Sequence, residues 1–226
     1  MLTLDDIRLP REAFDFRAAF DIAEAERVAV IGPSGGGKST LLNLIAGFET
    51  PDSGQILWQG KDLTTTAPGK RPIAMLFQDN NLFAHLDIEM NVALGLGPKL
   101  THETRRRARE ALAKVGLDGM AMRKPANLSG GQQSRAALAR LLLTDRPVIL
   151  MDEPFAALGP ALRSEMLALV TDLLPGATIL MVTHDPDEAQ SFSTQTVFVE
   201  DGEVRAPRGT AELFAAPDEA LGRYLR

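Results

Sequence analysis

Residues 32–40 read GPSGGGKST, and this stretch decides the fold. It has the spacing of a phosphate-binding loop, with a glycine, four other residues and then Gly-Lys-Ser. The apolar run 27–31 just before it predicts a buried strand, and apolar residues at helical spacing just after it predict a helix that stops at Gly47. A loop between a strand and a helix is the context that the motif requires. The stretch therefore predicts an α/β fold with a P-loop nucleotide-binding core.

The residue types of this loop suit a polyphosphate. Backbone N–H groups approach phosphate oxygens only where no Cβ intervenes, and three consecutive glycines remove that obstruction. The helix that follows directs its positive end at the anion, the lysine adds a mobile positive charge, and the serine hydroxyl suits Mg²⁺. We therefore expect ATP and Mg²⁺ as cofactors. The predicted nucleotide-binding residues of the loop are Gly32, Pro33, Ser34, Gly35, Gly36, Gly37, Lys38, Ser39 and Thr40.

Composition bounds the class of protein. The chain has 226 residues, 45% of them hydrophobic, which suits one large α/β domain or one domain with an inserted subdomain. The net charge of −6 argues against a nucleic-acid partner. No cysteine is present, which excludes disulfides and thiol chemistry. We expect no signal peptide and no membrane span, so any role at a membrane would require a partner.

The pattern of elements divides the chain. Residues 2–9 and 16–22 alternate imperfectly between apolar and polar and predict two strands of an N-terminal antiparallel β-subdomain. Residues 1–78 and 146–226 form the predicted α/β core. Residues 79–145 form an inserted, mostly helical subdomain, in which a helix over 101–115 should begin at Thr101 and carry an ion pair between Glu103 and Arg107.

Two acids follow the apolar run 148–151, which predicts a buried strand. In a P-loop protein, an acid at the end of a neighbouring strand is where Mg²⁺ needs a ligand, and we assign that role to Asp152. Glu153 is placed to accept a proton from the water that attacks the γ-phosphate. The pair predicts nucleotide hydrolysis.

The sequence LSGGQ at 128–132 precedes a helix rich in alanine and leucine. Ser129 and Gln132 have the spacing of a capping box, with two bare glycines between them. One interpretation is a well-capped helix and nothing more. The other is a second anion site that completes a nucleotide shared between two copies of the chain in an isologous dimer.

Taken in order, these motifs resemble those of the ATP-binding-cassette (ABC) ATPases, from Met1 to nearly the end of the chain. The resemblance adds a glutamine loop at Gln78 and a switch histidine at His184. It implies that Gln78 contacts Mg²⁺ or the water and senses a membrane partner, and that His184 positions the γ-phosphate and the water. The resemblance then implies that the catalytic residues are Lys38, Gln78, Glu153 and His184. It implies that the metal ligands are Ser39, Gln78 and Asp152. The residues that would contact ATP held by a second copy are Ser129, Gly130, Gly131 and Gln132.

Residues 39–54 (STLLNLIAGFETPDSG) and 71–86 (RPIAMLFQDNNLFAHL) are similar to the ATPase subunits of bacterial thiamine importers. That resemblance implies a peripheral location on the cytoplasmic face of the inner membrane. It also implies permease subunits that dock near Gln78 to Leu86, with a periplasmic solute-binding protein acting through them. An importer of another small solute is the alternative.

The chain departs from the family in two places that matter. Gly159 stands where the family usually has an aspartate that links the two sites of the dimer, so a weakly hydrolysing regulatory cassette is a further alternative. No tyrosine precedes the phosphate loop to stack on adenine, and Phe14 and Phe16 are the candidates. A soluble cassette for DNA or ribosomes is disfavoured because no long coiled coil and no second cassette are present, and a kinase or GTPase is disfavoured by LSGGQ.

Overall fold

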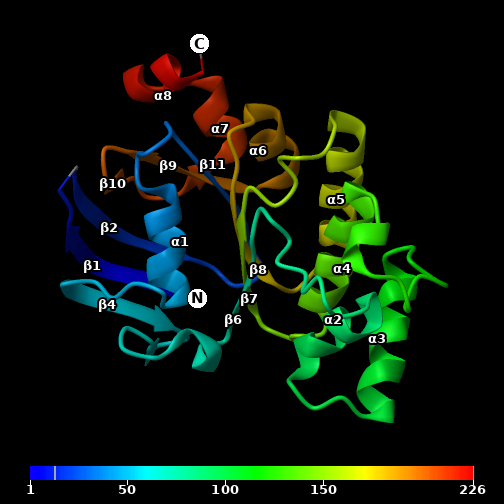
Figure 1. Cartoon of the computed structure of the whole chain (residues 1–226). Coiled ribbons are helices and arrows are strands. Elements are labelled where there is room, and N and C mark those ends of the chain that lie inside the picture. The colour runs from blue at the N-terminus through cyan, green and yellow to red at the C-terminus, as the bar shows by residue number, and fades with distance from the viewer. Residues whose placement is uncertain (13, 226) are drawn as a thin grey trace. The chain divides into compact units, whose positions relative to one another are not determined.

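A computed structural model describes residues 1–12 and 14–225 of the chain (Figure 1). Its residues group into two compact units. The first unit comprises Met1–Ile73, Pro147–Asp152 and Gly176–Arg226, and the second comprises Ala74–Arg146 and Glu153–Pro175. The helical insertion predicted over 79–145 falls within the second unit. Among the described residues, none of the helices has the length and apolar character needed to cross a membrane.

The first unit is built on strands. Its strands are β1 Leu2–Pro10, β2 Asp15–Ile22, β3 Arg27–Ile31, β4 Ser53–Trp58, β5 Lys61–Asp62, β7 Val148–Asp152, β8 Thr178–Val182, β9 Gln195–Glu200, β10 Glu203–Val204 and β11 Arg208–Gly209. Its helices are α1 Lys38–Ala46, α6 Pro186–Phe192, α7 Thr210–Ala215 and α8 Glu219–Tyr224, with a 3₁₀ turn at Pro68–Lys70. The chain passes to the second unit within β6, Ile73–Leu76.

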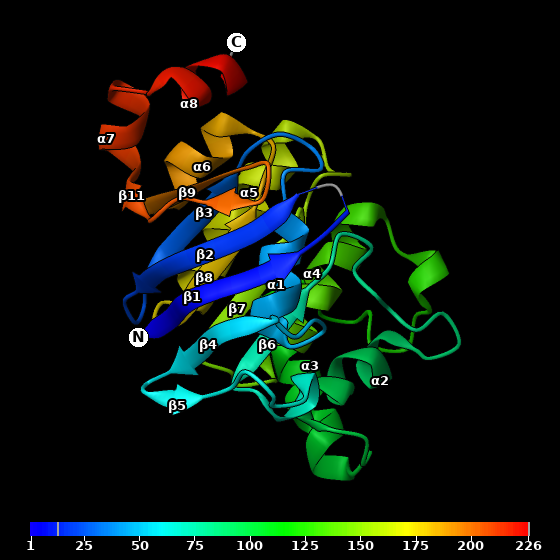
Figure 2. The same ribbon diagram turned by 90° about the vertical axis from the view of Figure 1, so that its left-hand side faces the viewer.

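The strands of the first unit follow the order β5-β4-β1-β2-β10-β9-β3-β8-β7, with β11 paired to β9. β1 pairs antiparallel with both β2 and β4, as the neighbouring ribbons in Figure 2 show, and this confirms the N-terminal antiparallel sheet. β2 alternates strictly between exposed and buried residues, as expected of a sheet with one wet face. β3, β7, β8 and β9 are parallel neighbours, and β8 is buried along its whole length. A parallel core of this kind is covered on both faces, which explains its uninterrupted apolar sequence.

The second unit is helical. Its helices are α2 Ile88–Ala93, α3 His102–Lys114, α4 Gly130–Leu142 and α5 Pro160–Leu173, with 3₁₀ turns at Leu94–Leu96 and Pro125–Asn127. The predicted cap at Thr101 is confirmed, because its side chain accepts a hydrogen bond from the N–H of Thr104. The predicted pair between Glu103 and Arg107 is wrong, because Glu103 binds Arg106 instead. Residues three and four positions apart are both neighbours on a helix surface, and the carboxylate pairs with Arg106 at i+3 rather than with Arg107 at i+4.

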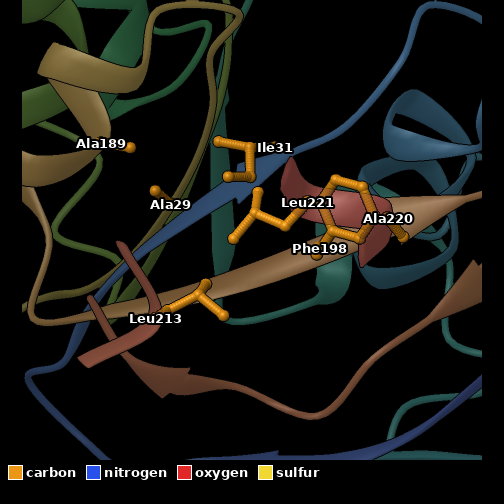
Figure 3. Packing of buried hydrophobic residues seen from close by; sticks show 7 residues of the cluster. All are labelled: Ala29, Ile31, Ala189, Phe198, Leu213, Ala220 and Leu221. Carbon is orange, nitrogen blue, oxygen red and sulfur yellow. The ribbon is translucent and has the colours of Figure 1, made fainter. Parts of the chain in front are cut away.

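A hydrophobic cluster holds the strand that leads into residues 32–40 (Figure 3). Ala29 and Ile31 of β3 and Phe198 of β9 pack there with Leu221 of α8, and all are buried. Leu213 of α7, Ala189 of α6 and Ala220 of α8 complete the cluster. The C-terminal helices therefore fix the position of β3 immediately before the phosphate loop begins.

Candidate functional site

The phosphate loop leaves β3 at Gly32. This glycine has a φ of +145°, and a Cβ built on it would lie 1.9 Å from the main-chain oxygen of Val199 in β9. No other residue fits so close to a neighbouring backbone. The loop is therefore seated directly on β9 at its first residue.

The middle of the loop is held by the hairpin that joins β9 to β10. The N–H of Gly202 donates to the main-chain oxygen of Gly36 at 2.9 Å. Asp201 and Gly202 form the turn of this hairpin, with φ values of +49° and +82°, as is common for an Asp-Gly pair. Gly37, with a φ of +111°, is the N-cap of α1. Since glycine has no side chain to cap the helix, the first N–H groups of α1 remain available to an anion.

Lys38 lies against the start of the loop. Its Nζ donates to the main-chain oxygens of Gly32 at 2.7 Å and of Pro33 at 2.9 Å, and the residue is 6% exposed. The ammonium is thus held by two carbonyl oxygens of the loop that it would serve. Ser39, the next residue, is exposed at the first turn of α1.

Asp152 and His184 share one edge of the sheet with the loop. Asp152 is the last residue of β7 and lies opposite Val182 of β8, which in turn lies opposite Val30 of β3. The N–H of Thr183 donates to the main-chain oxygen of Val30 at 3.2 Å, and His184 follows as an exposed residue. The carboxyl ends of parallel strands are where ligands bind in open α/β sheets. The first unit therefore brings together the phosphate loop, Asp152 and His184 at such an edge.

The segment of His184 is fixed on both sides. The Thr183 hydroxyl donates to the Glu188 carboxylate and accepts from the N–H of Asp185 at 3.0 Å. The hydroxyl of Tyr224, in α8, donates to the main-chain oxygen of His184 at 3.4 Å. Asp185 caps α6, and its side chain accepts a hydrogen bond from the N–H of Asp187. The histidine thus stands at the end of a buttressed turn.

Ser39 and Asp152 are a donor set that fits Mg²⁺. A hydroxyl at the start of α1 and a half-buried carboxylate are hard oxygen ligands. Over residues 1–12 and 14–225, no group of three His, Cys, Asp or Glu could hold a metal by itself. Mg²⁺ commonly takes one or two protein ligands together with substrate phosphates, which is the kind of site that these two residues would form.

Glu153 and Gln78 belong to the second unit. Glu153 follows Asp152 directly and has a φ of +45°, a left-handed conformation that is strained for this residue type. Its main-chain oxygen accepts from the N–H of Ala156 at 3.2 Å, which closes a tight turn. Strain of this kind is concentrated at functional sites.

The segment that begins at Gln78 is anchored to helices at both ends. Gln78 is exposed, and Arg140 of α4 donates to the main-chain oxygens of Asn80 and Asn81, each at 2.7 Å. Farther along, the fully buried Asn91 of α2 accepts from the N–H of Phe83 at 2.7 Å. The side-chain amide of Asn91 also donates to three main-chain oxygens between 83 and 87.

This segment, residues 78–87, therefore presents Phe83 on a rigid support, with 48% of the residue exposed. Arg140 and Asn91 are functional candidates that the sequence reasoning missed. The only sequence signal for either residue was a polar side chain among apolar positions of a helix.

The LSGGQ segment forms the predicted capping box. The N–H of Gln132 donates to the Ser129 hydroxyl at 3.3 Å, and the N–H of Ser129 donates to the Gln132 side chain at 3.0 Å. A Cβ on Gly131 would lie 2.4 Å from Leu162 of α5, so this glycine serves the packing of α4 on α5. Ser129 and Gly130 are exposed. The predicted capping box is confirmed, and the anion site stays a prediction.

Of the two candidates for stacking on adenine, Phe16 is excluded. It is fully buried and lies against Gly37, where a Cβ would come within 3.3 Å of its ring. Its alternating position in β2 directs it into the core. Phe14 is half-buried beside Gly202 and remains available.

Comparison with known proteins agrees with this geometry. Residues 17–156 match the ABC transporter family. The thiamine import ATP-binding protein ThiQ of Cereibacter sphaeroides is 56% identical over 229 residues, which cover 100% of this chain and 99% of that protein. The protein of the same name from Ruegeria sp. is 52% identical, with the same 100% and 99% coverage.

Two solved structures share the fold. The dimeric post-hydrolysis state of the ATP-binding cassette MJ0796 bound to ADP and Pi has a TM-score of 0.79 and 32% identity, and covers 93% of this chain and 99% of that one. The ADP conformation of the cassette MJ1267 has a TM-score of 0.89 over 100% of this chain and 98% of that one, at 24% identity. The chain therefore belongs to the ABC transporter family, as one of its ATPases.

Proposed function

We propose that this chain is the ATP-hydrolysing subunit of a bacterial importer of thiamine or its phosphate esters. Thiamine is proposed as the solute because two thiamine import ATP-binding proteins are more than 50% identical to this chain over its whole length. The phosphate loop supports ATP hydrolysis as the reaction. Thiamine itself would never contact this chain, so no side chain here determines the specificity for the solute.

ATP would bind with its phosphates over the loop 32–40. The N–H groups at the start of α1 and the ammonium of Lys38 would receive the β- and γ-phosphates. Ser39 and Asp152 would hold Mg²⁺, which supplies positive charge to the phosphate oxygens when bound. The half-buried Phe14 ring would offer a face to the adenine.

Hydrolysis would use the two residues that follow neighbouring strands. Glu153, directly after β7, would accept a proton from the attacking water, and His184, two residues after β8, would hold the γ-phosphate and the water in position. Gln78 would contact the metal or the water. The strained backbone of Glu153 and the buttressed turn of His184 support these roles.

Two copies of the chain would enclose two ATP molecules. The exposed Ser129 and Gly130, at the N-terminus of α4, would meet the γ-phosphate held by the other copy. The relative MJ0796 has been solved as a dimer, which supports this arrangement. ATP binding would close the dimer and hydrolysis would reopen it.

The permease would read this closure through residues 78–87. Their attachment to α4 and α2 suits a segment that transmits force, and the exposed Phe83 suits an apolar contact. The protein would accordingly work as a peripheral subunit on the cytoplasmic face of the inner membrane, with a periplasmic solute-binding protein acting through the permease.

Uptake of labelled thiamine by cells carrying this chain or its K38A variant tests the proposal. We expect uptake with the wild type and none with K38A. Steady-state ATPase activity of the chain, alone and with its permease, tests the alternatives. ATP turnover with uptake of a different solute would reassign the substrate. ATP binding without turnover would favour a regulatory cassette, for which the bare, exposed Gly159 at the start of α5 is the supporting feature.

A further inference from the structure

Among the described residues of the first unit, Arg71 has the largest fully buried side chain, at 1% exposure. It lies just after the 3₁₀ turn Pro68–Lys70 and shortly before β6. Its guanidinium donates four hydrogen bonds, all to main-chain oxygens. Burial lowers the pKa of this guanidinium and the nearby Asp62 carboxylate opposes the change, so the group stays charged at neutral pH. A buried cation with only carbonyl acceptors calls for an explanation, because burial of charge is costly unless its hydrogen bonds are complete.

Two of the acceptors are among the last four carbonyls of α1. Nη1 donates to the main-chain oxygens of Leu44 at 2.8 Å and of Ile45 at 2.7 Å. The final carbonyls of a helix have no partner within the helix, and their partial negative charge favours a cation. The last turn of α1 contains no basic residue of its own. Arg71 supplies the missing charge from a distant part of the chain.

The helix end is shaped to receive this arginine. Gly47, the C-cap of α1, has a φ of +87°, and a Cβ on it would lie 2.4 Å from Nε of Arg71. Only a glycine allows the guanidinium to approach the carbonyls so closely. Gly47 and Arg71 thus form one fitted contact.

The other two acceptors tie α1 to the β4–β5 hairpin and the loop after it. Nε donates to the oxygen of Thr66 at 2.8 Å, and Nη2 to that of Thr64 at 3.0 Å. The Thr64 hydroxyl accepts from the N–H of Ile56 in β4 at 2.9 Å and donates to Asp62 at 2.6 Å. The C-terminus of α1 is therefore bound to the sheet through Arg71.

The opposite end of the same helix is the phosphate site. α1 has only nine residues, so about 13 Å separate its two ends. A rigid helix fixed at its C-terminus is also fixed at its N-terminus. We propose that Arg71 is a positioning residue for nucleotide binding, which sets through α1 the place where Lys38, Ser39 and the first N–H groups meet the phosphates. This inference rests on the proposed binding of ATP to the loop.

The substitution R71K tests it. Lysine keeps the charge, but its single nitrogen cannot reach four oxygens spread over two segments. We expect the Kd for Mg-ADP, measured by calorimetry, to rise about fivefold, because a small displacement of a positioned group has a large effect at a phosphate site. The KM for ATP should rise with it, and kcat at saturating ATP should fall less.

R27K is the matched control. Arg27 also donates to a main-chain oxygen, that of Phe192 at 2.8 Å, is partly buried in the first unit, and does not bond to α1. R27K should lower the melting temperature and leave the Kd for Mg-ADP unchanged. If R71K does the same as R27K, Arg71 is only structural and the proposal is overturned.

A second variant, G47A, perturbs the same contact from its other side. The added Cβ would push against the guanidinium, so G47A should also weaken Mg-ADP binding, and it decides the question if R71K does not fold. Wild-type affinity in soluble G47A would count against the proposal. K38A separates this inference from the proposed function: Mg-ADP binding retained in K38A would refute both, whereas binding lost in K38A and retained in R71K would refute only the role of Arg71.

Discussion

The ammonium of Lys38 lies 2.7 Å from the main-chain oxygen of Gly32, six residues earlier in the chain. The lysine thus closes the loop on which it lies, and a phosphate would exchange this neutral carbonyl for a charged partner. The positively charged ammonium attracts an anionic phosphate more strongly than a neutral carbonyl, so the exchange favours the nucleotide.

K38A should therefore weaken nucleotide binding by about 10- to 100-fold, the loss expected for hydrogen bonds to a charged group. Calorimetric titration with Mg-ADP measures it. K61A, which removes an exposed lysine on β5, serves as the control and should bind as the wild type does. Equal affinities in the two variants would contradict the assignment of the loop.

G32A should destabilise the fold by more than about 3 kcal/mol, because it combines a strained backbone with an overpacked contact. The alanine Cβ would lie 1.9 Å from the oxygen of Val199. G60A is the matched control: Gly60 also has a positive φ, of +76°, but nothing lies within 4 Å of its Cβ position. Only the strain remains there, about 1 to 2 kcal/mol. Urea unfolding compares them, and equal losses would show that the contact with β9 is not tight.

The cap of α8 should make stability depend on pH in the acid range. The pKa of Asp218 is lowered from 3.8 because its carboxylate accepts from the N–H of Leu221 and lies beside Arg205. Its contribution is therefore complete above the unfolded value and is lost as the pH falls through the lower, folded value. D218A should be about 1 kcal/mol less stable than the wild type at pH 7, and this difference should shrink below pH 3.8. A difference that is constant from pH 7 to pH 3 would show that the carboxylate charge plays no part.

F83D should reduce co-purification of the permease with this chain. Phe83 is 48% exposed on the segment anchored by Asn91 and Arg140, and a carboxylate there would have to be desolvated in an apolar contact. The melting temperature should change little, because an exposed side chain contributes little to the core. Full recovery of the permease with F83D would place the docking surface elsewhere.

Local sequence patterns predicted the local structure well. The strand 27–31 and the caps at Thr101 and Ser129 are confirmed, since each depends on neighbours within a few residues. The fold class followed from the phosphate loop, and the ABC family from the order of its motifs.

Two of the missed features, Arg71 and Arg140, depend on distant main-chain atoms. Arg71 reaches carbonyls 26 and 27 residues away, and Arg140 reaches carbonyls 59 and 60 residues away. A carbonyl oxygen is the same in every residue and carries no sequence signal. The prediction of the partner of Glu103 failed for a related reason. Arg105 and Arg109 form ion pairs with Glu89, a buried carboxylate on another helix, and Arg106 forms the ion pair with Glu103.

The central claim is that ATP joins two copies of this chain and that its hydrolysis separates them. E153Q keeps the phosphate loop and the LSGGQ segment intact and removes the proposed base. Its molar mass with Mg-ATP, measured by light scattering during size-exclusion chromatography at high protein concentration, tests the claim most directly. We predict a stable dimer with ATP bound and almost no turnover. A monomer with its nucleotide site fully occupied would contradict the account.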